Sequence, residues 1–285
     1  MINIKVFGDV HANECFSYDK LSRIENVICD GKTNYIMFTG DLVDTNDFIR
    51  TDRIKRDILL KWIERLSSNS RFIMVPGNHD IFSKRSNKWI FDIDESFWKE
   101  LASIEGVSFI PTCEKYEDES IYVTGVDLGY DYYEKYQTHE DKEELLKRLK
   151  SIREKLLSTD RNKLNVFLSH SPVYMTDKGV LLLIEGFDLV LSGHMHNGGV
   201  LPFMAPFLPK NRGIISPKGR KFPNNARGTI DLNDNGSKLV ITGGISKIVE
   251  NSSITRKLNG MFPMEITEVE YNSENKESIV KSLYL

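Results

Sequence analysis

The sequence lacks a long hydrophobic run, a strong excess of charge of one sign, and a cysteine spacing typical of metal sites. No apolar stretch approaches the roughly 18 residues that cross a bilayer. We expect no signal peptide, because residues 1–7 indicate a strand and not a charged segment followed by an apolar one. A formal net charge of −3 argues against a protein that binds nucleic acid by electrostatics alone.

The three cysteines show no pattern typical of a metal site or of paired disulfides. Cys15, Cys29 and Cys113 are odd in number and are not spaced as metal ligands. This usage fits a reducing compartment, so we expect a cytoplasmic protein. The remaining composition, 40% hydrophobic and 28% charged, is that of a globular protein. A chain of 285 residues is long enough to bury a substantial core.

Short apolar segments recur along the chain, and each ends abruptly in a turn that contains Gly, Asp, Asn or His. The five clearest are 4–7, 35–38, 72–75, 166–168 and 189–191. Such short apolar runs predict buried strands, and the glycines and prolines after them mark turns. Apolar residues at helical spacing predict amphipathic helices at 54–66 and 141–157, with a shorter one at 18–28. Strands that alternate with helices predict an α/β core.

The chain changes character after residue 196. Three further strands are predicted there, at 229–232, 239–242 and 265–271, with no comparable helix between them. We predict a single domain over 1–285, in which a motif-bearing core (1–200) is followed by a strand-rich part (201–285).

The segment 201–227 begins apolar and proline-rich and continues with six basic residues: Lys210, Arg212, Lys218, Arg220, Lys221 and Arg227. One interpretation is a solvated loop with scattered cations. The other is a substrate-binding loop, whose cations contact a phosphate and whose apolar part meets an acyl or other nonpolar group.

Polar residues follow the predicted strands, at the edge where open α/β sheets bind ligands. They are Asp9, His11, Asp41, Asn78, His79, His170, His194 and His196. Five of the six histidines belong to this set; the sixth, His139, has no motif around it and is interpreted as a surface residue. Asp9 and His11 are two apart in a segment expected to be extended, so their side chains should point to one side. His194 and His196 have the same spacing.

These residue types predict a pair of divalent metal ions. The two spaced pairs would supply four converging ligands. Asp41 can offer one carboxylate oxygen to each ion, and His170 with the Asn78 amide oxygen would complete the second site. Imidazole nitrogens mixed with carboxylate oxygens suit Mn, Fe, Zn, Ni or Co. Two such ions can hold a nucleophile and stabilise the entering and leaving oxygens of an in-line displacement at phosphorus.

Each of these residues alone has a simpler explanation. Asp9 and Asp41 suit turns and helix caps. Asn78, which follows Gly77, suits a left-handed turn. The metal site is favoured because every motif occurs at the end of a predicted strand.

Five motifs, taken in order, resemble the signature blocks of the calcineurin-like metallophosphoesterases. They are Asp9-Val10-His11, Gly40-Asp41-Leu42-Val43-Asp44, Gly77-Asn78-His79-Asp80, His170, and Gly193-His194-Met195-His196. The resemblance implies an α/β fold, a four-layer sandwich of two mixed β-sheets flanked by α-helices. The last block is also similar to that of a bacterial branch with the sequence Gly-His-Thr-His-Gly-Gly-Gln. Here Met195 replaces the Thr, and Asn197 separates His196 from the glycines.

The resemblance also implies residue roles. One ion would take Asp9, His11, Asp41 and His196, and the other would take Asp41, Asn78, His170 and His194. His79 is similar to the family histidine that protonates the leaving group or stabilises the transition state, and Asp80 would orient its ring. Asp44 is expected either near these ligands or as a helix cap.

We therefore expect a dinuclear metal-dependent phosphohydrolase that acts on small-molecule phosphate esters through a metal-bridging hydroxide, with phosphodiesters favoured over monoesters. Two alternatives stay open: a catalytically silent metal-binding module of the same fold, and a Mn-dependent nuclease. A metal-dependent amidohydrolase on a (β/α)₈ barrel is disfavoured. That family carries its His-x-His pair on the first strand, whereas here the pair comes last.

Overall fold

The computed structural model describes residues 1–13, 16–85, 88–134, 140–156, 162–217, 219–233, 236–245 and 262–285. Cys15, His139 and Lys218 lie outside the described residues, and so does the side chain of Cys113. Among the described helices, none is long and apolar enough to cross a membrane.

Two six-stranded mixed sheets form the centre of the molecule. The first has the order β14-β13-β1-β2-β3-β6 and contains β1 (Ile2–Phe7), β2 (Tyr35–Phe38), β3 (Arg71–Met74), β6 (Val107–Phe109), β13 (Glu265–Asn272) and β14 (Glu277–Tyr284). The second has the order β11-β12-β10-β9-β8-β7 and contains β7 (Lys115–Glu117), β8 (Ile121–Val126), β9 (Leu164–Ser169), β10 (Leu189–Ser192), β11 (Gly228–Asp231) and β12 (Lys238–Ile241). The middle strands pair in parallel, and antiparallel pairing is confined to the outer strands and the β1–β13 pair.

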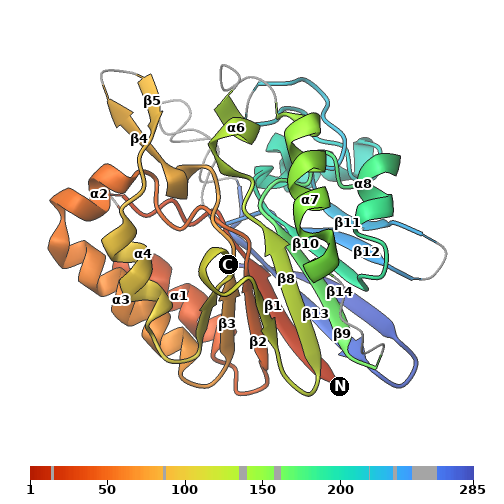
Figure 1. Ribbon diagram of the computed structural model, residues 1–285, viewed down its shortest axis with the longest axis horizontal. Coiled ribbons are helices and arrows are strands. Elements are labelled where there is room, and N and C mark those ends of the chain that lie inside the picture. The colour runs from red at the N-terminus through yellow and green to blue at the C-terminus, as the bar shows by residue number, and fades with distance from the viewer. Residues whose placement is uncertain are drawn as a thin grey trace.

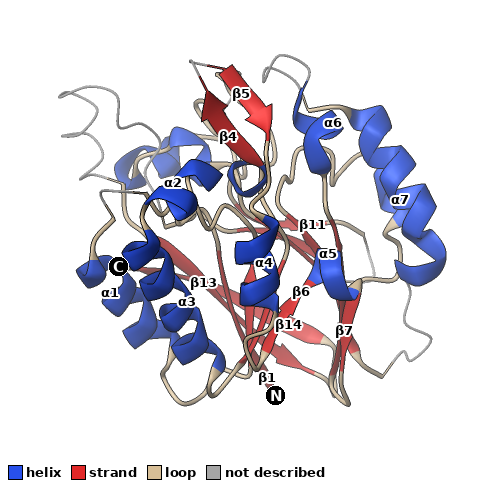
Figure 2. Cartoon of the chain, turned by 60° about the vertical axis from the view of Figure 1, so that its left-hand side comes forward, coloured by secondary structure: helices blue, strands red, loops and turns tan. Residues whose placement is uncertain are grey.

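Helices flank the two sheets on opposite sides (Figure 1). One side carries α1 (Tyr18–Ile28), α2 (Asn46–Thr51), α3 (Arg53–Ser67) and α4 (Glu95–Ala102). The other carries α6 (Gly129–Glu134), α7 (Lys142–Leu156) and α8 (Lys178–Leu183), and the short α5 (Ile110–Cys113) links β6 to β7. A hairpin of β4 (Phe82–Arg85) and β5 (Lys88–Phe91) stands at the top in both views, opposite the N-terminus (Figure 2). The described residues also include three short 3₁₀ helices: η1 (His79–Ile81), η3 (His196–Gly199) and η4 (Pro202–Phe207).

Three hydrophobic layers hold this arrangement together. Side chains from both sheets, among them Val6 and Leu191, fill the layer between the sheets. A second layer joins the first sheet to α1, α3 and α4, and includes Trp62. A third joins the second sheet to α6, α7 and α8, and includes Leu145. The predicted four-layer sandwich of two mixed sheets flanked by helices is confirmed.

Local sequence accounts for the elements that matter most to the site. Strands β1, β2 and β9 are buried nearly throughout because both of their faces are covered. Helix α3 begins where the Asp52 side chain accepts a hydrogen bond from the Lys55 amide at 3.0 Å. It buries Leu59, Trp62 and Leu66 at helical spacing, so the predicted helix at 54–66 is confirmed.

Candidate metal centre

All seven predicted metal ligands lie together where β1, β2, β3, β9 and β10 end. The first three of these strands belong to the first sheet and the last two to the second. The site therefore spans both sheets at their carboxyl ends. Each ligand sits within four residues of the last residue of its strand, so its position is set by buried backbone and not by a long loop.

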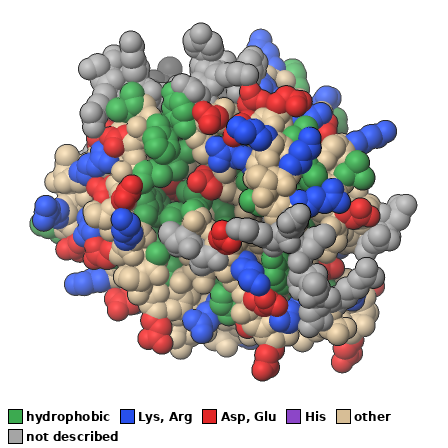
Figure 3. Space-filling model, viewed as in Figure 1, with side chains coloured by type: hydrophobic (Ala, Val, Ile, Leu, Met, Phe, Trp, Pro, Cys, Tyr) green, Lys and Arg blue, Asp and Glu red, His purple; other side chains and the backbone are tan. Residues whose placement is uncertain are grey.

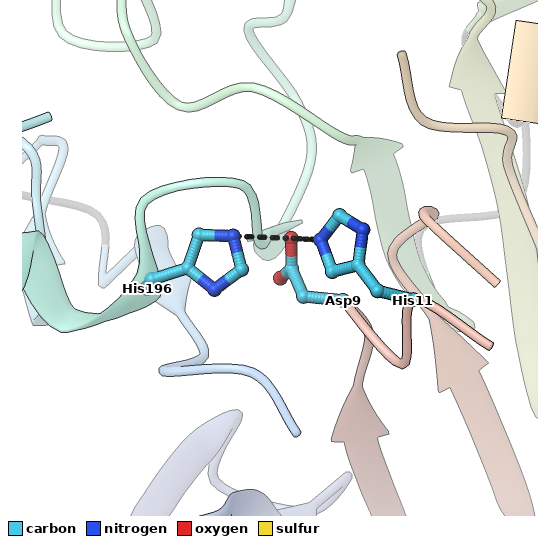
Figure 4. Close-up of side chains that lie close together, drawn as sticks. All are labelled: Asp9, His11 and His196. Atoms are coloured by element: carbon cyan, nitrogen blue, oxygen red, sulfur yellow. Dashed lines mark ion pairs between the residues drawn. The ribbon is translucent and has the colours of Figure 1, made fainter. Parts of the chain in front are cut away.

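The first group consists of Asp9, His11 and His196 (Figure 4). Oδ1 of Asp9 lies 3.7 Å from Nε2 of His196 and 4.0 Å from Nε2 of His11. The imidazole rings of His11 and His196 stack on each other, with centroids 5.3 Å apart. Three ligand atoms thus converge on one point.

The second group consists of Asp41, His170 and His194, with Asn78 beside them. Nε2 of His170 is its centre: it lies 3.2 Å from Oδ2 of Asp41, 3.2 Å from Oδ1 of Asn78 and 3.1 Å from Nδ1 of His194. The His170 ring is held from behind by a contact of 2.7 Å between Nδ1 and the Thr39 carbonyl.

Asp41 connects the two groups. Its Oδ2 lies 3.5 Å from Nε2 of His11 and 3.2 Å from Nε2 of His170. Its Oδ1 accepts a hydrogen bond from the His79 amide at 2.8 Å, which fixes the carboxylate. Only glycine fits at position 77, because a Cβ there would lie 2.1 Å from Oδ1 of Asp41. A single carboxylate oxygen therefore faces both halves of the site.

The backbone that carries the ligands is not extended, and the expectation of extended Asp-x-His and His-x-His segments is wrong. Five ligand residues adopt left-handed conformations, with φ of 52° (Asp9), 46° (His11), 57° (Asp41), 67° (His194) and 46° (His196). Non-glycine residues in this region cost on the order of 1 kcal/mol or more each. The strain is opposed by hydrogen bonds between the loops, such as those from the Asp9 and His11 amides to the carbonyls of Gly40 and Asp41.

The pKa values of the candidate ligands shift in both directions. Burial would lower the pKa of His170, but the Asp41 carboxylate outweighs it and raises this pKa to about 9. Burial lowers the pKa of His196 to about 4 and also lowers the pKa of His194, so both imidazoles are neutral, the form that binds metal. Burial would raise the pKa of Asp41, but the neighbouring His170 and His79 hold it well below its usual range. Nε2 of His11 and Nε2 of His194 are buried and find no hydrogen-bond partner among the described residues. Such a donor set fits divalent metal ions.

Asp44, not Asp80, contacts the His79 ring. Nδ1 of His79 lies 2.8 Å from the Asp44 carbonyl oxygen and 3.3 Å from its Oδ1. The Asp80 carboxylate instead accepts hydrogen bonds from four backbone amides, those of Asp41, Leu42, Val43 and Gly77. The predicted orienting contact from Asp80 is therefore replaced by one from Asp44. Asp80 ties the two loops that carry Asp41 and Asn78 to each other.

Glu140 also lies beside the site, although it was not among the predicted site residues. This residue precedes α7, and its side chain is only 3% exposed. Its Oε1 lies 3.7 Å from Nε2 of His194, and its Oε2 lies 3.2 Å from Nη2 of Arg220. Nothing in the sequence marked it, because it stands in a charged stretch without a motif. Arg220 shows that the segment 201–227 reaches the site.

With this geometry established, comparison with known proteins identifies the family. A family model described as calcineurin-like phosphoesterase matches residues 2–198. The chain belongs to this family. The family is one of metal-dependent phosphoesterases, and the match ends just after the His194-x-His196 pair.

The individual proteins that resemble this chain share little sequence identity with it. An uncharacterized metallophosphoesterase of Helicobacter pylori is 25% identical over 207 residues, which is 71% of this chain and 46% of that protein. The chain thus spans about half the length of this curated relative. A solved structure described as a 5'-nucleotidase from Staphylococcus aureus, in complex with alpha-ketoglutarate, aligns with 99% of this chain and 53% of its own, at 12% identity and a TM-score of 0.49. A Vps29 mutant from Entamoeba histolytica aligns with 100% and 99%, at 10% identity and a TM-score of 0.36. Similarity this loose implies nothing about what the present chain binds or cleaves.

Proposed function

We propose that this chain hydrolyses phosphate esters at a centre of two divalent metal ions. The observation that carries the proposal is the position of Asp41, whose Oδ2 lies within 3.5 Å of a histidine nitrogen in each group. When bound, two such ions supply positive charge and an activated water for in-line attack on phosphorus. The mixture of nitrogen and oxygen ligands suits Mn, Fe, Zn, Ni or Co.

The candidate ligands can be divided between two ions, and His11 and Asp41 also form a group with His79. Asp9, His11 and His196 would hold one, Asn78, His170 and His194 would hold the other, and Asp41 would serve both. These contacts agree with the division that the family resemblance implies.

His79 is the proposed proton donor to the leaving group. Burial would lower the pKa of His79, but the carboxylates of Asp41 and Asp44 outweigh it and raise this pKa to about 9. Its Nδ1 lies 2.8 Å from the Asp44 carbonyl oxygen, so we propose Nε2 as the nitrogen that donates the proton. A protonated imidazole there can protonate a departing alkoxide.

Diesters are favoured over monoesters on electrostatic grounds. A phosphomonoester carries about −1.5 to −2 charges near neutral pH, whereas a diester carries about −1. The half-exposed Asp44 carboxylate beside His79 repels the more highly charged ester more strongly.

The segment 201–227 supports a substrate with an apolar part. Phe203 and Phe207 on η4 are exposed, at 62% and 86%, and Arg220 of the same segment reaches the site. We also propose a cytoplasmic location, which the free thiol of the exposed Cys29 supports.

The test is hydrolysis of paired chromogenic esters by the purified chain. With Mn²⁺, we expect bis(p-nitrophenyl) phosphate to be cleaved with higher kcat/KM than p-nitrophenyl phosphate, and EDTA to abolish both reactions. Single- and double-stranded DNA should stay intact, because Lys/Arg and Asp/Glu side chains are intermingled on the face seen in Figure 3. Metal binding without hydrolysis of any ester would favour the silent module; cleavage of DNA would favour the nuclease.

A further inference from the structure

Glu140 is a buried carboxylate at the edge of the second ligand group, outside every sequence motif. Its backbone carbonyl accepts a hydrogen bond from the Tyr174 hydroxyl at 2.9 Å, which anchors the residue. Its side chain lies between His194, at 3.7 Å, and Arg220, at 3.2 Å. A buried carboxylate is unfavourable unless it is paired, so these two contacts explain why the fold retains it.

The two nitrogens of His194 face different partners. Nδ1 lies 3.1 Å from Nε2 of His170 in the second ligand group, whereas Nε2 lies 3.7 Å from Oε1 of Glu140, an ion-pair distance longer than a hydrogen bond. A neutral imidazole carries one N–H, and a carboxylate at Nε2 favours the proton there. The lone pair is then on Nδ1, directed at the site where an ion would sit. Carboxylates placed in this way orient metal-binding histidines in many proteins.

We propose that Glu140 is a positioning residue that holds His194 with Nδ1 as its ligand atom, and that Arg220 holds Glu140 in place. The segment 201–227 would thereby be coupled to the second metal site. This inference rests on the proposed function, since it requires an ion in the group of Asp41, His170 and His194. Arg220 would then act on the metal site first, and on substrate only through it.

The direct test is Mn²⁺ binding by Glu140→Gln, measured by isothermal titration calorimetry with metal content checked by mass spectrometry. We expect the affinity for the second ion to fall about 10- to 100-fold, the effect of losing such a partner, while the first ion binds as in the wild type. Arg220→Ala should weaken the same ion by a smaller factor. Asp118→Asn is the matched control: Asp118 accepts hydrogen bonds from Tyr35 and Tyr116, far from the ligands, and its loss should leave both affinities unchanged.

A second measurement needs no variant. In the wild-type protein loaded with Zn²⁺ and labelled with ¹⁵N-histidine, long-range ¹H–¹⁵N spectra should show His194 protonated at Nε2. Protonation at Nδ1 would overturn the inference, and so would identical Mn²⁺ isotherms for wild type and Glu140→Gln. A wild-type chain that binds no Mn²⁺ would instead overturn the proposed function itself, so the two failures are distinguishable.

Discussion

At the scale of single residues, the candidate site is stabilised by hydrogen bonds between loops that are far apart in sequence. Asp80 joins the loop after β3 to the loop after β2, and the Asp9 carboxylate accepts hydrogen bonds from the His194 amide at 3.0 and 3.2 Å. Such contacts fix both the ligand atoms and the backbone that carries them. They explain how five ligand residues persist in left-handed conformations.

Replacing His79 by Gln should lower kcat about 10²- to 10⁴-fold, the range expected for loss of a general acid. Metal content should stay the same, because His79 is not among the ligands assigned to either ion. Steady-state kinetics and metal analysis on the same preparation check this. Loss of metal from the variant would show that His79 is a ligand and not the proton donor.

Replacing Gly77 by Ala should weaken metal binding, because its Cβ would lie 2.1 Å from Oδ1 of Asp41 and must displace that carboxylate. The circular dichroism spectrum should keep its native form. Gly179→Ala in α8 is the matched control, since its Cβ meets only ordinary or slightly tight contacts. Equal Mn²⁺ affinity for wild type and Gly77→Ala would mean that Asp41 does not hold the ions.

At the scale of elements, sequence patterns predicted most of the buried parallel strands and the long helices but missed other pieces. Strand β8 was missed although it is fully buried and its apolar run ends at Thr124-Gly125, the same pattern that predicted the strand at 35–38. Strand β14 is largely exposed and mixes charged with apolar residues, so neither a buried run nor a clean alternation marks it. Glu140 was missed for a related reason: only the fold brings its side chain close to His194 and Arg220.

In the segment 201–227, the expected effect of a substitution depends on whether the residue contacts Glu140. Because Arg220 is engaged by Glu140, we expect Lys221→Ala to raise KM for an anionic ester several-fold without changing Mn²⁺ affinity. Arg220→Ala should change both quantities. Steady-state kinetics at saturating Mn²⁺, combined with calorimetry, separate the two effects. An unchanged KM in both variants would remove the segment from substrate binding.

At the scale of the whole molecule, the C-terminal strands are part of the sandwich. β12 pairs with β10 and β13 pairs with β1, so each sheet includes strands from both the motif-bearing part and the chain after residue 200. Four of the seven candidate ligands follow β1 and β10, the strands with which these later strands pair. The sequence motifs predicted residues that the fold brings together at the candidate site, but the sheet order that supports it required the structure.

Deletion of residues 262–285 should therefore prevent stable folding, because it exposes the edge of β1 and removes the buried Ile266 and Val269. A shorter deletion of residues 277–285 removes only the largely exposed β14 and should cost less stability. Urea unfolding followed by circular dichroism distinguishes them. A cooperatively folded, Mn²⁺-binding chain that ends at residue 261 would refute the expectation.

In the proposed centre, the carboxylate of Asp41 would bind both metal ions. Electron paramagnetic resonance of the Mn²⁺-loaded protein tests it most directly, because ions about 3.5–4 Å apart with a shared ligand give the multiline spectrum of a coupled pair. We predict that spectrum for the wild type and its loss in Asp41→Asn. Two uncoupled Mn²⁺ signals in the wild type, or a single bound ion at saturation, would contradict the account.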